Sequence, residues 1–275
     1  MYKLRFNFFH IGDQIATTAI PENVFRASGR KCIITQPQIW AFQHNPYVVF
    51  MDEAQAAEYP EISLIPDCRA TQQAQHYFDS MKNMTAGSQS EYMCVNFGVS
   101  DPVLRHPRLY LHEDKKTIPH KVVVHTSGSD RTRDGEPAIR HASGEDEVRV
   151  MSDAVLGSIL ENYRDYELIQ VGSPADKPLG GHSIDMRGQH DYWQLAGEIA
   201  SAAKFIGVNS GPMHIANCYP RLEKRIVMME LPQETLRQFR PGDVRNWLFS
   251  WLDPSNMFFN KLDTDVGLTF SHRKI

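Results

Sequence analysis

Residues 204–217 have the sequence KFIGVNSGPMHIAN, which predicts a buried strand followed directly by a helix. The strand is the apolar run at 204–208, and Pro212 suits the first helical turn because proline has no N–H to leave unpaired there. Ser210 can cap the helix, and Gly211 lets the backbone approach a bound group closely. Parallel sheets with crossover helices are built from such junctions, so this segment indicates an α/β fold.

The same junction is a candidate anion site, because the free N–H groups at the start of a helix attract negative charge. His214 follows about one helical turn later and would point toward the same ligand. A plain turn with a structural histidine is the alternative interpretation.

Short apolar runs and helical stretches alternate along the rest of the chain. Strands are predicted at residues 3–9, 31–35, 47–51, 61–65, 121–125, 167–171, 204–208 and 225–229, and helices at 15–27, 148–163, 192–201 and from 212. Residues 98–121 are rich in proline, histidine and charge, and we place a linker within them, near 113–119. The sequence therefore predicts two domains, 1–116 and 117–275.

The composition excludes several classes of protein. The chain has 275 residues, with 29 basic and 33 acidic side chains and a formal net charge of −4, which argues against a broad basic surface for nucleic acid. No apolar stretch approaches the roughly 18 residues that cross a bilayer. The four cysteines form no CxxC pair. We expect a cytoplasmic protein with free thiols, no membrane span and no nucleic-acid partner.

A second junction lies near the N-terminus, where residues 10–18 read HIGDQIATT. Gly12 permits a tight exit from the preceding strand, and Asp13 stands at the expected N-cap position. A carboxylate at such a turn is either a helix cap or a general base for a ligand at the sheet edge. The local sequence leaves both roles open for Asp13.

The third junction, HTSGS at residues 125–129, follows an apolar strand and precedes Arg131 and Arg133. Small hydroxyl side chains and a glycine can surround phosphate oxygens with donors, and a guanidinium can neutralise them. We predict a phosphate-binding role for Thr126 and Ser127. The two arginines are either ligands or solvated side chains of the loop at 127–147, which is too long for a simple turn.

Five segments of the chain resemble, in order and approximate spacing, glycosyltransferase family nine, the ADP-heptose heptosyltransferases. They are HIGDQIATTAIP (10–21), VVVHTSGS (122–129), LIQVGSP (168–174), IDMRGQHDYWQLAGEIASAAKFIGV (184–208) and FIGVNSGPMHIANC (205–218). The resemblance implies a GT-B fold, in which two Rossmann-like domains face a cleft, the N-terminal one binding the acceptor and the C-terminal one the nucleotide-sugar. It also implies an inverting, metal-independent transfer of a heptose or related sugar to an acceptor hydroxyl.

The resemblance also assigns roles to individual residues. Asp13 matches the family's general base. The implied donor-binding residues are Thr126, Ser127, Gly128, Arg131, Gly172, Met186, Asn209, Ser210, Gly211 and His214, and the implied acceptor-binding residues are His10, Gly12 and Gln14. No metal or cofactor is implied. The donor is a nucleoside-diphosphate sugar, with an ADP-linked one expected first, and the acceptor is a glycan, a lipid-linked molecule or a small molecule.

Two departures from the family pattern motivate an alternative function. Asn209 stands where the family commonly has aspartate. Residues 129–139 hold no clear equivalent of the family's lysine, for which Arg131 or Arg133 can substitute. The alternative is a nucleotide-sugar-binding protein, or a degenerate glycosyltransferase subunit, that has lost catalysis.

Overall fold

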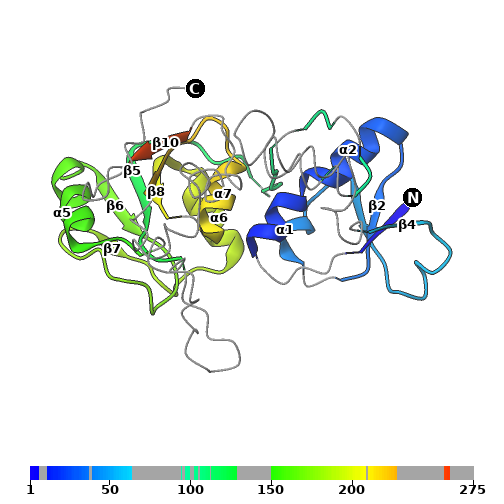
Figure 1. Ribbon diagram of the computed structural model, residues 1–275, viewed down its shortest axis with the longest axis horizontal. Coiled ribbons are helices and arrows are strands. Elements are labelled where there is room, and N and C mark those ends of the chain that lie inside the picture. The colour runs from blue at the N-terminus through cyan, green and yellow to red at the C-terminus, as the bar shows by residue number, and fades with distance from the viewer. Residues whose placement is uncertain are drawn as a thin grey trace, which may run out of the picture. The chain divides into compact units, whose positions relative to one another are not determined.

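The structure, a computed structural model, divides into two compact units, the first beginning at Met1 and the second at Glu113 (Figure 1). It describes residues 1–5, 11–36, 39–63, 94, 97–99, 102–104, 106–111, 113–128, 150–208, 210–227 and 257–260, with the backbone alone for Asp13, 225–227 and 257–260. The predicted site residues His10, Arg131 and Asn209 lie outside the described residues.

The first unit contains a parallel sheet with the strand order β3-β2-β1-β4. Its strands are β1 (Tyr2–Arg5), β2 (Cys32–Ile34), β3 (Val48–Phe50) and β4 (Glu61–Ser63), and its helices are α1 (Ile11–Thr17), α2 (Ala19–Ser28) and the short 3₁₀ helix η1 (Trp40–Phe42). β2 is buried along its whole length, as expected of an inner strand in a parallel sheet.

The single helix predicted at residues 15–27 is instead two helices, α1 and α2, that meet at Thr18. The Thr18 hydroxyl donates to the carbonyl of Ile15 at 2.6 Å and accepts the backbone N–H of Arg108 at 2.8 Å. Such a local hydroxyl-to-backbone bond competes with the regular helix ladder. α2 then ends at Gly29, whose left-handed backbone (φ 69°) lets its N–H bond the carbonyl of Phe25.

The second unit contains a parallel sheet with the strand order β10-β9-β8-β5-β6-β7. Its strands are β5 (Ile118–His125), β6 (Glu167–Gln170), β7 (Ile184–Asp185), β8 (Ala202–Gly207), β9 (Glu223–Val227) and β10 (Met257–Asn260), and its helices are α5 (Asp153–Asn162), α6 (Tyr192–Ala200) and α7 (Gly211–Asn217). α5 covers one face of the sheet, and α6 and α7 cover the other (Figure 1). The predicted α/β class is therefore confirmed.

The core of the second unit follows from the alternation of side chains along β5. Val122 and Val124 belong to one buried cluster with Val155 and Ile159 of α5. Because successive side chains of a strand point to opposite faces, Val123 and His125 face the other side, where α6 and α7 contact β8. His125 thus lies on the face that carries α7.

Some predicted boundaries differ from the observed ones. β5 begins at Ile118, within the predicted linker, and its pairing with β8 shifts register between Ile118 and Val122. Pro119 lies in this interval and has no N–H for a regular ladder, so an irregular register is expected there. α5 begins at Asp153 rather than at 148, because Ser152 caps it by accepting the N–H of Val155 at 3.3 Å. β7, β10 and η1 were not predicted.

Candidate functional site

The candidate site lies at the carboxyl ends of β5 and β8, where the strand order of the second sheet reverses. From β5 the chain adds β6 and β7 on one side and then returns to place β8 on the other. In open parallel sheets, ligands bind in the crevice at this topological switch point. The register pairs His125 with Gly207, the last residues of the two strands. Two of the three predicted junctions, at 125–128 and at 210–214, therefore come together here.

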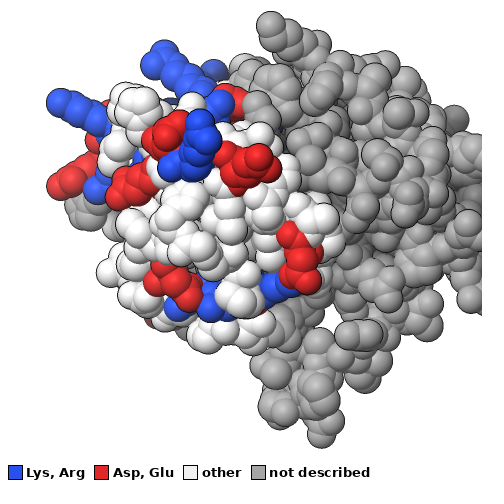
Figure 2. All heavy atoms as spheres, turned by 90° about the vertical axis from the view of Figure 1, so that its left-hand side faces the viewer, with Lys and Arg blue, Asp and Glu red and all other residues white. Residues whose placement is uncertain are grey.

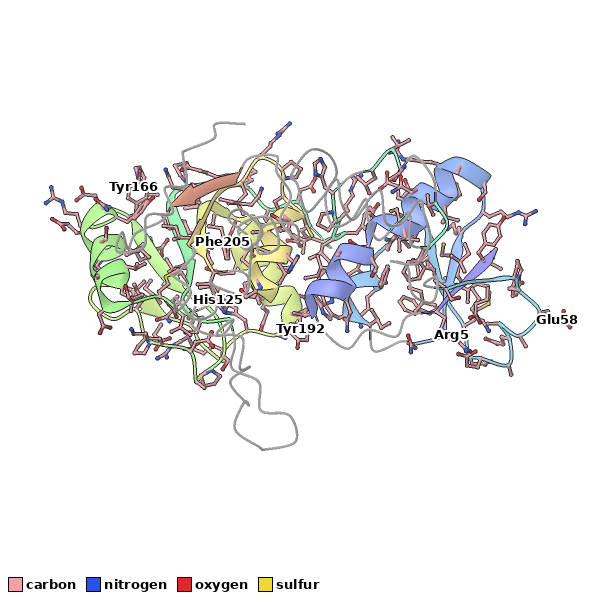
Figure 3. The ribbon with its side chains drawn as sticks, viewed as in Figure 1. Arg5, Glu58, His125, Tyr166, Tyr192 and Phe205 are labelled. Carbon is pink, nitrogen blue, oxygen red and sulfur yellow. The ribbon has the colours of Figure 1, made fainter. Side chains whose placement is uncertain are left out.

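His125, labelled in Figure 3, contacts two other side chains at this edge. Its Nδ1 lies 2.8 Å from the hydroxyl oxygen of Ser210, and its Nε2 lies 3.1 Å from Oδ2 of Asp176. All three side chains are buried, Ser210 with 9% of its surface exposed. We call Asp176, His125 and Ser210 the switch-point chain. It links β5, the loop after β6 and the start of α7.

Gly172 makes room for this chain. Its backbone has φ 132°, which side chains of L-residues rarely adopt. A Cβ at this position would overlap the carboxylate of Asp176 and lie 2.9 Å from Cδ2 of His125. The resemblance implied a donor-binding role for Gly172. In the structure, its missing side chain allows Asp176 to reach His125.

Ser210 occupies the N-cap position of α7 but does not cap it. Its backbone is extended, as a cap requires, yet its side chain makes no hydrogen bond to the helix N–H groups. The hydroxyl instead contacts His125 and the carbonyl of Val208, at 3.1 Å from the latter. Ser210 therefore stands at the predicted N-cap position. The predicted hydrogen bond from its side chain to the helix is wrong, because the hydroxyl contacts His125 instead.

Gly211 and His214 both belong to α7. Gly211 is its first residue, and Pro212 follows in the first turn as predicted. His214 is buried one turn further on, and its N–H bonds the carbonyl of Ser210 at 3.3 Å. Both residues therefore lie at the same edge as the switch-point chain.

The hydroxyls of Thr126 and Ser127, predicted to bind phosphate, hold a neighbouring loop. Thr126 Oγ1 donates to the carbonyl of Lys177 at 2.5 Å, and Ser127 Oγ accepts the N–H of Lys177 at 2.9 Å. Gln170, fully buried in β6, donates to the same carbonyl at 2.8 Å and accepts the N–H of Leu179 at 2.6 Å. These four bonds fix Lys177 and Leu179 against β6 and the residues that follow β5. Gly128, which follows Ser127, is half-buried.

The rest of this loop is fixed by charged side chains. Lys177 Nζ lies 2.9 Å from Oδ1 of Asp153 at the start of α5. Arg187 donates to the backbone carbonyl of Asp176 and pairs with Asp185 at 2.7 Å. Hydrogen bonds from the Arg187 side chain and backbone lower the pKa of Asp185 to about 2. Met186, another predicted donor ligand, bonds the carbonyl of Gln170 through its N–H at 2.9 Å.

The junction near the N-terminus lies in the first unit. α1 begins at Ile11, so Asp13 is inside its first turn and not at the N-cap position where the sequence placed it. Gly12 and Gln14 lie in the same turn. The Gln14 side-chain oxygen is buried and makes no hydrogen bond within the described part of the chain.

Other features of the described residues bear on the remaining predictions. Cys32, Cys94 and Cys218 are buried free thiols. No helix in the described ranges is long and apolar enough to span a membrane. On the face of the second unit shown in Figure 2, the described acidic and basic side chains are interspersed among neutral ones, without a broad basic area.

Comparisons with known proteins identify the fold. No family model and no curated protein matches the chain. A glycosyl transferase family 9 structure from Veillonella parvula matches with a TM-score of 0.62 and 13% identity, over 94% of this chain and 85% of that one. ADP-heptose LPS heptosyltransferase II of E. coli matches with a TM-score of 0.52 and 11% identity, over 83% and 85%.

A third match is the dodecameric iron-containing heptosyltransferase TibC from enterotoxigenic E. coli, solved in complex with ADP-D-β-D-heptose. Its TM-score is 0.55 at 15% identity, and the match covers 82% of this chain and 57% of TibC. The resemblance found in the sequence is confirmed at the level of the fold: this chain has the fold of the family 9 glycosyl transferases and heptosyltransferases.

Proposed function

We propose that this protein is a glycosyltransferase whose donor is a nucleoside-diphosphate sugar, bound at the switch point of the second sheet. The observation that supports this most directly is the meeting of His125, Ser210 and His214 at the carboxyl edge of β5 and β8. The Ser210 hydroxyl and the His214 imidazole are hydrogen-bonding groups of the kind that suit phosphate oxygens, and His125 positions the hydroxyl. The fold shared with TibC, which was solved with a nucleotide-sugar, agrees with this class of donor.

The proposed reaction is a single inverting displacement. Asp13 removes the proton of the acceptor hydroxyl, and the acceptor oxygen forms a bond to the anomeric carbon. The bond from that carbon to the diphosphate breaks, and the nucleoside diphosphate leaves with the electron pair. Donors fixed in advance at the departing oxygens stabilise this growing charge without a metal ion. The proposal includes a GT-B organisation, with Rossmann-like domains at 1–116 for the acceptor and 117–275 for the donor.

The proposal includes an acceptor site near the start of α1, where Gly12 and Gln14 lie in the first turn. We expect a hydroxyl-bearing acceptor, either a glycan, a lipid-linked molecule or a small molecule, and an ADP-linked donor.

A thermal-shift panel of ADP-, GDP-, UDP- and dTDP-linked sugars tests the donor class. A ligand at a hundred times its Kd stabilises the folded state by about 2.7 kcal/mol, which raises the midpoint of unfolding measurably. The absence of a shift with every member of the panel would contradict the proposal.

Turnover is measured next, as release of nucleoside diphosphate in the presence of candidate acceptors. His214→Ala should abolish it, whereas His182→Ala, at an exposed histidine in the loop between β6 and β7, should not. Specific binding without any turnover would identify a non-catalytic nucleotide-sugar-binding protein instead.

A further inference from the structure

The two ring nitrogens of His125 have different partners, and this restricts where its protons can be. Nε2 faces Oδ2 of Asp176 at 3.1 Å, and the same oxygen accepts the backbone N–H of Ser173, also at 3.1 Å. An ionised carboxylate only accepts hydrogen bonds, so Nε2 carries a proton. The charge state of His125 is then decided at Nδ1, which faces the Ser210 hydroxyl at 2.8 Å.

The Ser210 hydroxyl has one proton, and the state of Nδ1 determines where that proton goes. When His125 is neutral, Nδ1 is an acceptor, and the hydroxyl donates to it in preference to the more distant carbonyl of Val208 at 3.1 Å. When His125 is charged, Nδ1–H donates to the hydroxyl oxygen. The Ser210 hydroxyl then donates its proton to the Val208 carbonyl, and it can turn from that carbonyl to donate to an oxygen of an incoming ligand.

The charge of Asp176 adds to this effect. With neutral His125, the buried Asp176 carboxylate keeps a negative charge at the edge where an anion would bind, and the nearby Arg187 offsets this charge in part. With charged His125, the two side chains form a neutral pair. Both effects therefore make an anionic ligand at Ser210 bind more tightly to the protonated form of His125.

We infer that binding of a nucleoside-diphosphate sugar is coupled to the uptake of one proton by His125, which frees the Ser210 hydroxyl to donate to the diphosphate. This inference rests on the proposed function and adds a property to it. The proton comes from solvent and is held at Nδ1 of His125. The Nε2–H group of His125 keeps its hydrogen bond to the Asp176 carboxylate. His125 and Asp176 are positioning residues that act through Ser210.

Other titratable and charged groups also lie near His125. Of the described elements packed against it, the loop after β6 contributes Asp176 and α7 contributes His214, one turn beyond Ser210. The remaining charged side chains of that loop are Lys177, which pairs with Asp153, and Arg187, which pairs with Asp185 and also interacts electrostatically with Asp176. His125 is the imidazole in direct contact with the Ser210 hydroxyl.

Calorimetry on the unmodified protein tests the inference. ADP-glucose, UDP-glucose, GDP-mannose and dTDP-glucose are titrated in HEPES and in Tris, and the difference in binding enthalpy between buffers gives the protons taken up. These diphosphates are esterified at both ends, so they lack the phosphomonoester proton with a pKa of about 6. We expect net proton uptake on binding, and a Kd that is higher at pH 8 than at pH 6.

Variants assign the proton to His125. His125→Gln should bind without proton uptake and with a Kd independent of pH. Asp176→Asn removes the charge that favours imidazolium, and should move half-maximal uptake to lower pH. His182→Gln, at an exposed histidine, should keep the uptake of the unmodified protein. A histidine with a purely structural role would change the stability of these variants but not the number of protons.

The outcomes separate this inference from the proposed function. Binding with equal enthalpy in both buffers and a Kd unchanged from pH 6 to 8 would overturn the coupling and leave the proposed function in place. Proton uptake that persists in folded His125→Gln would also overturn it. If no nucleotide-sugar in the set binds, both the inference and the proposed function fall. If His125→Gln does not fold, the measurements on the unmodified protein and on Asp176→Asn still test whether binding is coupled to proton uptake.

Discussion

Nε2 of His125 lies 3.1 Å from Oδ2 of Asp176, and both side chains are almost fully buried. The two residues are far apart in sequence, one ending β5 and the other in the loop after β6. Their contact depends on Gly172, because any larger residue there would occupy the space of the Asp176 carboxylate. The pair therefore links the conformation of one loop to the histidine that holds Ser210.

Gly172→Ala should destabilise the protein by about 2 kcal/mol or more, because it adds a steric overlap to an unfavourable φ. Gly157→Ala is the matched control: Gly157 lies in α5 with nothing within 4 Å of an added Cβ. That change should stabilise by about 0.5–1 kcal/mol, since glycine is a poor helix former. Urea unfolding measures both. Equal effects would show that Gly172 has no special steric role.

Glu22→Gln should destabilise the first unit by about 1–3 kcal/mol at neutral pH. The Glu22 carboxylate is 1% exposed and lies 2.6 Å from Arg26, 3.3 Å from Arg108 and 2.7 Å from the Tyr110 hydroxyl. Burial alone would raise the pKa of Glu22, but the hydrogen bonds from Tyr110 and Arg26 and the charges of both arginines bring it below its usual value.

The same carboxylate predicts a pH dependence. Because the folded pKa of Glu22 is lowered, its contribution is complete above the unfolded value of about 4.3 and is lost as the pH falls through the folded value. The difference in unfolding free energy between Glu22→Gln and the unmodified protein should therefore shrink below about pH 4. Exposed Glu58, changed to Gln, should give a difference below about 0.5 kcal/mol at any pH. A gap that is constant from pH 7 to 3 would contradict the role of the Glu22 charge.

Asp13→Ala should lower turnover by about 10²- to 10⁴-fold and leave donor affinity nearly unchanged, as expected for loss of a general base. Steady-state kinetics and calorimetry with the donor measure the two effects separately. Glu58→Ala, at an exposed carboxylate of the same unit, is the control and should keep full turnover. Unchanged turnover in Asp13→Ala would remove Asp13 from the mechanism.

Cys32 should resist thiol reagents in the folded protein. It is fully buried in β2, and burial raises its pKa to about 12, so almost no reactive thiolate exists near neutral pH. Peptide mass spectrometry after treatment with Ellman's reagent at pH 8 should find Cys32 unmodified in buffer and modified in urea. Rapid labelling in buffer would show that β2 opens easily.

The sequence predicted well those features that depend on neighbouring residues. The buried strands at 121–125 and 204–208 follow from unbroken apolar runs, and the start of α7 follows from Pro212 and its flanking residues. The break at Thr18 could not be predicted, because one of its two bonds comes from Arg108, far along the chain. β7 was not predicted for a different reason: it consists of two exposed residues, which are too few to show a periodic pattern.

The site was predicted in outline and not in its contacts. Thr126, Ser127, Ser210 and His214 lie at one edge, as parallel topology dictates. The sequence did not indicate that Lys177 engages the first two hydroxyls, nor that Ser210 faces His125. A histidine at the end of an apolar strand was the one available signal for His125, and only the fold brings Asp176 to it.

β10 has a consequence for how the second unit assembles. β9 lies between β8 and β10, and its outer partner comes from residues 257–260, which follow the other described strands in sequence. While the polypeptide is still emerging from the ribosome, β9 has a row of unpaired N–H and C=O groups, the kind of edge that recruits strands from other molecules. In a C-terminal deletion that removes these four residues, the edge of β9 would stay unpaired. We expect such a deletion variant to be expressed as insoluble protein.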